Sequence, residues 1–132
     1  MNRDFTPNKD EIRALLNLAE ENLRLAKLEF QENFIRGTIS KAYYVFLDMA
    51  RAALLSKSLI TKTHSSAITK FGEEFIKTGL LPKEYGRWFN RALRARQEAD
   101  YEALKSFTVE EAQEIIVQAE KFFTAVKEII KF

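Results

Sequence analysis

Residues 40–55 read SKAYYVFLDMARAALL, and this stretch decides the fold. Drawn as a helix, it carries apolar side chains nearly all round its circumference, apart from a narrow polar arc that includes Asp48 and Arg51. A helix that is hydrophobic on almost every side lies at the centre of its protein. The two charges interrupt the run, which is also shorter than the roughly 20 residues that a membrane span requires. We therefore expect a central core helix and no membrane segment.

Other helices have to cover this central one. Apolar residues recur at three- and four-residue intervals in four further segments, and no strand alternation stands out. These segments cover about residues 8–30, 63–78, 82 to between 96 and 104, and 108 onward. Short connections favour antiparallel neighbours. The sequence thus predicts an all-α fold, an up-and-down helical bundle of four long helices plus a shorter fifth, as one domain over residues 1–132.

Small polar residues, glycine and proline mark the expected helix ends. The central helix is expected to follow Gly37, with Thr38 as its cap, and the third is expected to stop at Gly79. Pro82 then permits a new helical start. Capping pairs are predicted for the first and last helices, at Asn8 with Glu11 and at Thr108 with Glu111.

Composition excludes several classes of site. The 132 residues contain no cysteine, which rules out disulfides, thiolate zinc sites and cysteine nucleophiles, and the single His64 rules out clustered-histidine metal sites. The four glycines are not spaced as a phosphate-binding loop. We expect no metal and no cofactor. A net charge of +2 is too balanced for a general nucleic-acid coat. With no secretory signal at the start, a cytoplasmic location is expected.

Arg96 is a charged residue on the apolar face of its predicted helix. On a helical wheel of residues 87–99 it falls in the middle of the apolar arc. A guanidinium cannot lose its proton and is costly to bury alone. Asp100 lies one helical turn further on, so we predict an Arg96–Asp100 pair. Such a pair could be structural, at the bundle edge or a dimer seam. Alternatively, Asp100 could orient the planar guanidinium of Arg96 so that it binds phosphate or an RNA backbone. The spacing leaves both interpretations open.

Three further motifs follow the central stretch in a fixed order. They are THSS at 63–66, FGEEFIKTGLL at 71–81 and RQEADY at 96–101. Together with residues 40–55, they resemble the HEPN superfamily of small helical bundles, specifically its prokaryotic UPF0332-type branch. The resemblance implies a helical bundle that commonly forms a homodimer, with the arginine motif of each subunit near a shared groove.

The resemblance also implies two kinds of function. Many relatives are metal-independent endoribonucleases, whose motif is Arg, four to six residues and then His. Others are partners of small nucleotidyltransferases in toxin–antitoxin or stress-response pairs. Here Tyr101 stands where the first permitted His would be, and no His follows it. The first interpretation is therefore a nucleotide- or RNA-binding module with a nucleotidyltransferase partner, in which Tyr101 is a candidate acceptor of a nucleotide.

The candidate binding residues come from two helices. They are Arg96, Asp100, Tyr101, Tyr43, Tyr44 and Asp48. The alternative function is a metal-independent endoribonuclease that uses Arg96 with His64 or Tyr101. Because tyrosine has an ordinary pKa of about 10, it exchanges protons poorly near neutrality. The enzyme therefore needs His64 beside Arg96, although a lone histidine near a helix start is also typical of a cap or a surface residue. A structural homodimer without catalysis is the second alternative.

The fourth helix also carries a basic stripe. Arg87, Arg91 and Arg94, with Lys83 nearby, follow one solvent-facing side of it. These side chains could contact phosphates through charge alone. An ordinary solvated helix face is the plainer interpretation of the same pattern.

Overall fold

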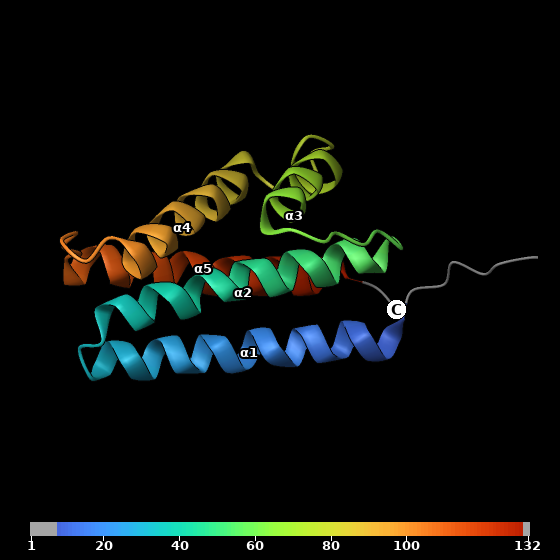
Figure 1. The fold of residues 1–132 in the computed structure, drawn as a ribbon. Helices are drawn as coiled ribbons and strands as arrows, with labels where there is room; N and C mark the ends of the chain where they lie inside the picture. The colour runs from blue at the N-terminus through green and yellow to red at the C-terminus, as the bar shows by residue number, and fades with distance from the viewer. Residues whose placement is uncertain (1–7, 131–132) are drawn as a thin grey trace, which may run out of the picture.

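The computed structural model describes residues 8–130 as helices joined by short connections, without a strand in that range. Successive long helices run in opposite directions, and the short α3 lies across them (Figure 1). The elements are α1 (Lys9–Gln31), α2 (Ile35–Ser56), α3 (His64–Phe71), the π-helix η1 (Gly72–Ile76), α4 (Lys83–Tyr101) and α5 (Val109–Ile129). The expected all-α fold of four long helices and a shorter one is confirmed.

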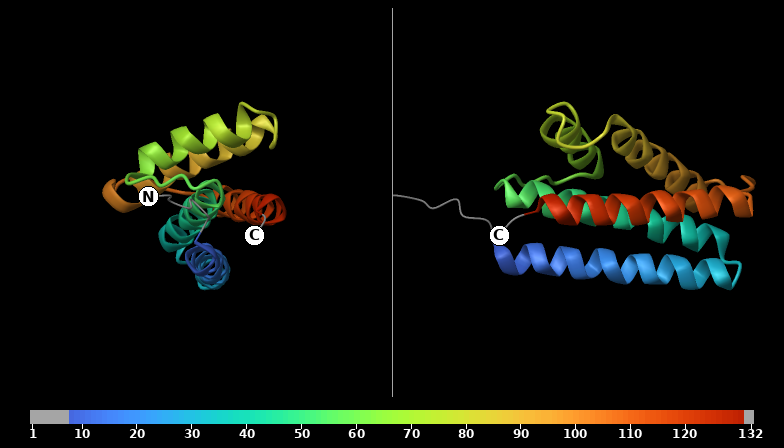
Figure 2. Two further views of the ribbon diagram at one scale, coloured as in Figure 1. Left: turned by 90° about the vertical axis from the view of Figure 1, so that its right-hand side faces the viewer. Right: turned by 180° about the vertical axis from the view of Figure 1, so that it is seen from behind.

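The helix α2 is the axis around which the others pack. Viewed along the bundle, α1, α5 and the pair of α3 and α4 surround it on different sides (Figure 2). Phe46 of α2 lies 4.7 Å from Phe122 of α5 and 5.9 Å from Phe89 of α4, measured between ring centroids. Large aromatic rings contribute much of a core's buried apolar area. The apolar stretch therefore lies where its composition predicts.

Side-chain caps begin three of the helices. Asn8 caps α1, and the Thr108 hydroxyl accepts a hydrogen bond from the backbone N–H of Glu111 at 3.0 Å at the start of α5. Both caps match the prediction. A reciprocal capping box occurs at α3, where Thr63 and Ser66 each accept the backbone N–H of the other. This box fixes where α3 starts, and hence where His64 lies.

The start of α2 corrects the sequence prediction. The helix begins at Ile35, before Gly37, because Asn33 adopts a left-handed conformation with φ 64° and turns the chain earlier. Thr38 does not cap the helix. Its hydroxyl donates to the carbonyl of Phe34 at 2.8 Å, one turn back inside the helix.

The third segment also differs from its prediction as a single helix over residues 63–78. Its α-helical part ends at Phe71, and the π-helix η1 follows. Phe71 and Phe75 stay on the core face, with ring centroids 5.1 Å apart. One extra residue in one turn barely changes the apolar spacing, so periodicity does not separate the two helix types. The chain then leaves η1 and turns at Gly79, whose φ of 84° suits glycine.

Candidate functional site

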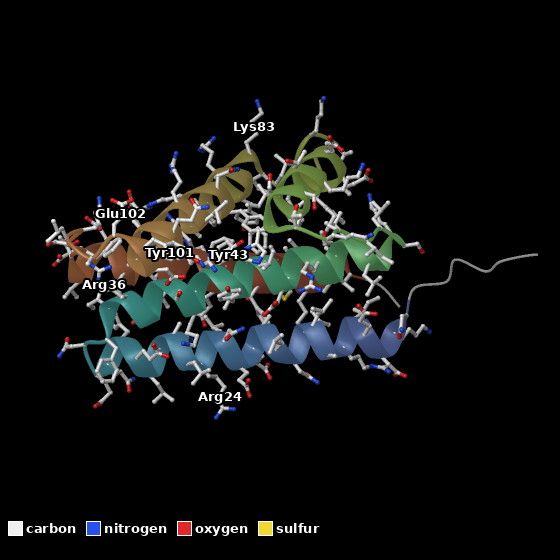
Figure 3. The ribbon with its side chains drawn as sticks, in the orientation of Figure 1. Arg24, Arg36, Tyr43, Lys83, Tyr101 and Glu102 are labelled. Carbon is white, nitrogen blue, oxygen red and sulfur yellow. The ribbon has the colours of Figure 1, made fainter. Side chains whose placement is uncertain are left out.

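Side chains from three helices meet where α4 crosses α2 beside the start of α3. Figure 3 places Tyr43 in this region. We call the group the arginine cluster: Arg96 and Asp100 of α4, Tyr43 and Tyr44 of α2, and His64 of α3. The crossing of α2 and α4 brings together residues that lie some fifty positions apart in the chain.

Arg96 is held from several directions. Its Nε lies 3.0 Å from Asp100 Oδ2, which confirms the predicted pair, and its Nη2 donates to the Tyr44 hydroxyl at 3.0 Å. The contact with Asp100 is ionic, since the buried Nε has no hydrogen-bond partner in the part of the chain that is described. The guanidinium carbon also lies 5.6 Å from the ring centroids of Tyr43 and Tyr44. These contacts orient the fork while 16% of the side chain stays exposed.

The charge of Arg96 is permanent. Burial alone lowers the pKa of Arg96, but the hydrogen bond to Tyr44 and the nearby Asp100 raise that pKa above its ordinary value overall. A cation whose donors are oriented in advance suits the binding of phosphate. The cluster therefore offers a fixed positive charge at a partly open position.

Asp100 connects α4 to α2. One of its carboxylate oxygens contacts Arg96, and the other accepts a hydrogen bond from the Ser40 hydroxyl at 3.0 Å. The next residue, Tyr101, is 76% exposed. It is the last residue of α4, directly after Asp100. The Tyr101 side chain is thus open to solvent beside a fixed cation.

Tyr43 and His64 form a second contact across the cluster. The Tyr43 hydroxyl lies 3.0 Å from His64 Nδ1. Burial raises the pKa of Tyr43 to about 12, and burial, followed by the charges of Arg96 and Arg51, lowers the pKa of His64. The hydroxyl proton has no other acceptor within residues 8–130, so we assign Tyr43 as donor and the neutral imidazole as acceptor. His64 is therefore uncharged at neutral pH.

The structure does not bring every candidate residue to the cluster's surface. Tyr43 is completely buried, so its ring has no face open to a ligand, whereas Tyr44 is only half-buried. Asp48 faces α1 instead, where its Oδ2 accepts a hydrogen bond from the Asn22 side-chain amide at 3.0 Å. It is 3% exposed, and burial raises its pKa to about 6. Asp48 and Tyr43 can therefore act on a bound ligand only through other residues.

Arg36 is a residue that sequence reasoning missed. Its guanidinium caps the C-terminal end of α4 by donating to the carbonyls of Ala99 at 2.8 Å, Ala103 at 3.1 Å and Lys105. It also lies 5.6 Å from the centroid of the Phe107 ring. Figure 3 shows Arg36 at the end of the bundle where α4 finishes. Nothing in the sequence pairs the start of α2 with the end of α4, so only the fold reveals this contact.

The four cations of the basic stripe on α4 do not all face the same surroundings. Arg91 turns to α5 and forms an ion pair with Glu114. Lys83, Arg87 and Arg94 instead border a groove beside α3 and η1. These three cations therefore line a different surface from the arginine cluster.

Residues 8–130 also offer no site of two further classes. No group of three or more His, Cys, Asp or Glu side chains there could hold a metal ion. No helix in the same range has the length and apolar character to cross a membrane. What the cluster offers chemically is a phosphate-binding cation, a neutral imidazole and the exposed hydroxyl of Tyr101.

The sequence is similar to known proteins over nearly all of its length. The sequence matches the family model described as "HEPN domain" over residues 12–129. It is 38% identical to "Putative toxin MJ0605" of Methanocaldococcus jannaschii over 131 residues, covering 99% of this chain and 95% of that protein. It is 34% identical to a "UPF0332 protein" of Thermotoga maritima over 113 residues, covering 86% of each. A second protein of M. jannaschii, "Putative toxin MJ0142", is 31% identical over 122 residues, covering 92% of this chain and 83% of that protein.

The matched region contains all the residues of the arginine cluster, and the fold is the helical bundle that the resemblance implies. The chain belongs to the HEPN domain family, in the branch whose members carry the UPF0332 name.

Proposed function

We propose that this chain is a toxin-like HEPN module that binds the phosphates of a nucleotide or RNA at the arginine cluster. It works with a small nucleotidyltransferase in a toxin–antitoxin or stress-response pair, as a cytoplasmic homodimer. The names of two relatives, both called toxins, support the toxin-like part of the proposal. The resemblance of residues 40–101 to the family supports the nucleotidyltransferase partner.

The observation that carries the binding proposal is the way Arg96 is held. A charged side chain that leaves water loses hydration, and here its contacts with Asp100 and Tyr44 offset part of that loss. Those contacts engage Nε and Nη2, while Nη1 has no partner in the described range and can donate to a ligand. The exposed Tyr101 next to Asp100 can approach the same ligand.

The test compares two arginine variants of the full chain. Arg96→Met keeps most of the aliphatic volume but removes the charge, and Arg24→Met removes an exposed charge from α1 on the far side of the molecule (Figure 3). Thermal unfolding is followed with ATP, ADP, AMP, GTP and a single-stranded RNA. We expect at least one of them to raise the Tm of the wild type and of Arg24→Met but not of Arg96→Met. If none raises the Tm of the wild type at saturating concentration, the binding proposal is wrong and a structural dimer is favoured.

The position of His64 favours a second candidate function, metal-independent RNA cleavage. His64 lies in the same cluster as Arg96, with its ring centroid 6.1 Å from that of Tyr44. This function uses the other tautomer of His64, in which Nδ1–H donates to the Tyr43 hydroxyl and Nε2 accepts the proton of an RNA 2′-hydroxyl. As the new 2′-oxygen–phosphorus bond forms, the phosphorus–5′-oxygen bond breaks, and the leaving 5′-oxygen takes a proton from water. Arg96 would stabilise the charge on the phosphate.

RNA cleavage in the presence of a chelator tests this second candidate. The wild type, Arg96→Met and His64→Gln are incubated with the same RNA, and His64→Gln keeps a side chain that can accept from Tyr43. Cleavage by the wild type that falls at least a hundredfold in both variants would support the enzyme. Equal cleavage by all three would mean a contaminating nuclease, and no cleavage at all removes this candidate.

A further inference from the structure

A groove of about 770 Å³ runs between the α3–η1 segment and residues 83–94 of α4. Its lining is divided by chemistry. The apolar lining consists of Ile68, Phe71, Ile76 and Phe89, with Gly72 and Gly86 between them. The charged lining consists of Lys77, Lys83, Arg87 and Arg94. We call this feature the α3–α4 groove.

All the charges that line the groove are positive. Its lining contains no acidic side chain, and none of its four cations forms an ion pair within residues 8–130. Neighbouring cations behave differently. Arg91 on the same helix pairs with Glu114, and Lys70 of α3 pairs with Glu73. The α3–α4 groove therefore combines an apolar surface with a concentrated positive charge that the protein itself does not neutralise.

We propose that the α3–α4 groove binds an acidic amphipathic segment of a partner protein. Aliphatic side chains of that segment enter the apolar lining, and its Asp or Glu side chains meet the four cations. A volume of about 770 Å³ accommodates several aliphatic side chains, as pockets for ligands and helix-binding grooves do. Complementary charge speeds association and selects against basic partners.

The lining favours a peptide over a nucleic acid. Proteins that bind single-stranded nucleic acid stack the bases on exposed aromatic rings. The two rings of the groove, those of Phe71 and Phe89, are each only 1% exposed, so they offer no stacking face. The partly exposed apolar side chains are the aliphatic Ile68 and Ile76. They match the Leu, Ile or Val side chains of a protein segment better than they match a base.

The two terminal segments of this sequence do not match the groove in charge. Outside the described range, residues 1–7 carry one Arg and one Asp, and residues 131–132 are Lys and Phe. Neither segment has an acidic surplus that would match four cations. The groove is also distinct from the arginine cluster, since the two share no residue. The inference therefore does not depend on nucleotide or RNA binding by Arg96.

Two kinds of variant separate charge from apolar contact. The double variant Lys83→Glu/Arg87→Glu reverses half of the groove's charge. Its matched control, Lys9→Glu/Arg24→Glu, makes the same change in net charge on α1; Figure 3 shows Arg24 and Lys83 projecting from opposite sides of the molecule. Gly72→Leu fills the apolar lining, because a Cβ on Gly72 meets no atom within 4 Å and the backbone there has a helical φ of −59°.

The experiment selects binders from a phage-displayed library of random peptides on the full chain, then measures each synthetic peptide by fluorescence anisotropy. We expect the selected peptides to carry an excess of Asp and Glu and to place Leu, Ile or Val at helical spacing. Their Kd should rise at least tenfold for Lys83→Glu/Arg87→Glu and for Gly72→Leu, and should not change for Lys9→Glu/Arg24→Glu. Circular dichroism checks that each variant is folded.

Several results would overturn the inference. They are a selection without enrichment, peptides without an acidic excess, and affinities that the groove variants leave unchanged. A loss of binding to a single-stranded RNA in Lys83→Glu/Arg87→Glu, without any effect on peptides, would mean that the groove is a nucleic-acid path. A lower mass in solution for the groove variants than for the wild type would mean that a second copy of this chain occupies the groove.

Discussion

The hydroxyl of Tyr43 and the Nδ1 of His64 lie 3.0 Å apart, which joins the buried centre of α2 to the first residue of α3. The contact holds the imidazole beside Arg96 and satisfies a hydroxyl that would otherwise be buried without a partner. An unsatisfied buried polar group costs about 1–3 kcal/mol. Both the stability of the fold and the protonation of the cluster therefore depend on this hydrogen bond.

Tyr43→Phe tests this contact. The change removes the hydroxyl and leaves His64 without its donor, so the free energy of unfolding should fall by about 1 kcal/mol. A hydrogen bond that is donated to the neutral imidazole favours the neutral form, and its loss should raise the pKa of His64. Urea unfolding and an NMR titration of the imidazole measure the two effects. An unchanged titration would show that Tyr43 does not donate to His64.

Asp100→Asn tests how far Asp100 neutralises Arg96. The amide keeps the shape of the carboxylate and still accepts from Ser40, but it removes the negative charge. Affinity for a nucleotide or RNA that binds at Arg96 should rise roughly twofold at low salt, because a partly exposed ion pair contributes only about 0.5 kcal/mol. Asp10→Asn, which removes a nearly fully exposed carboxylate from α1, is the control. A tenfold weaker affinity would instead mean that Asp100 is needed to orient Arg96.

Asp48→Asn should change how stability depends on pH. The pKa of Asp48 is about 6 in the fold against an ordinary 3.8, so the unfolded chain loses this proton first as pH rises. The stabilisation is complete below about pH 3.8 and is lost as pH rises through about 6. Two pKa units correspond to about 3 kcal/mol. The Asn variant lacks this loss and should exceed the wild type in stability at about pH 8 but not at about pH 4.

Urea unfolding of both proteins at the two pH values measures that difference. The comparison cancels the titration of the other carboxylates, which the two proteins share. A gap in the free energy of unfolding that stays the same at both pH values would contradict the raised pKa of Asp48.

Arg36→Met should loosen the end of α4. The variant removes charged hydrogen bonds to the carbonyls of Ala99 and Ala103, and we expect the free energy of unfolding to fall by about 2 kcal/mol. Amide hydrogen exchange should quicken around residues 99–105 before it does elsewhere. Arg36→Lys should rescue little, because an ammonium lacks the planar fork that reaches several carbonyls. Uniformly faster exchange along the whole chain would count against a local cap.

Several features of this protein followed from local sequence. The apolar run at 40–55 predicted the central helix, the caps at Asn8 and Thr108 predicted two helix starts, and the position of Arg96 predicted its pair with Asp100. Each of these depends on residues within a single helical segment. Such patterns can be recognised without knowing the tertiary structure, because helix geometry alone decides which side chains of a helix lie next to one another.

Local sequence did not predict the early start of α2 or the π-helix. The first depends on the left-handed turn at Asn33, and the second changes the spacing of Phe71 and Phe75 too little to be visible as a pattern. Asp48 illustrates a different difficulty. Its place on a narrow polar arc made it a candidate binding residue, whereas the packing of α1 against that arc buries it beside Asn22.

By itself, the amino-acid order determined that the chain forms helices, which of them lies innermost, and that Arg96 needs a carboxylate one turn away. Only the packing of distant segments decided that His64 and Tyr44 join that pair, that Arg36 caps α4, and that unpaired cations surround an apolar groove. The physical reason is the distance along the chain over which each interaction acts. Helix periodicity is set by bonds a few residues long, whereas these contacts join residues that are close only once the bundle has formed.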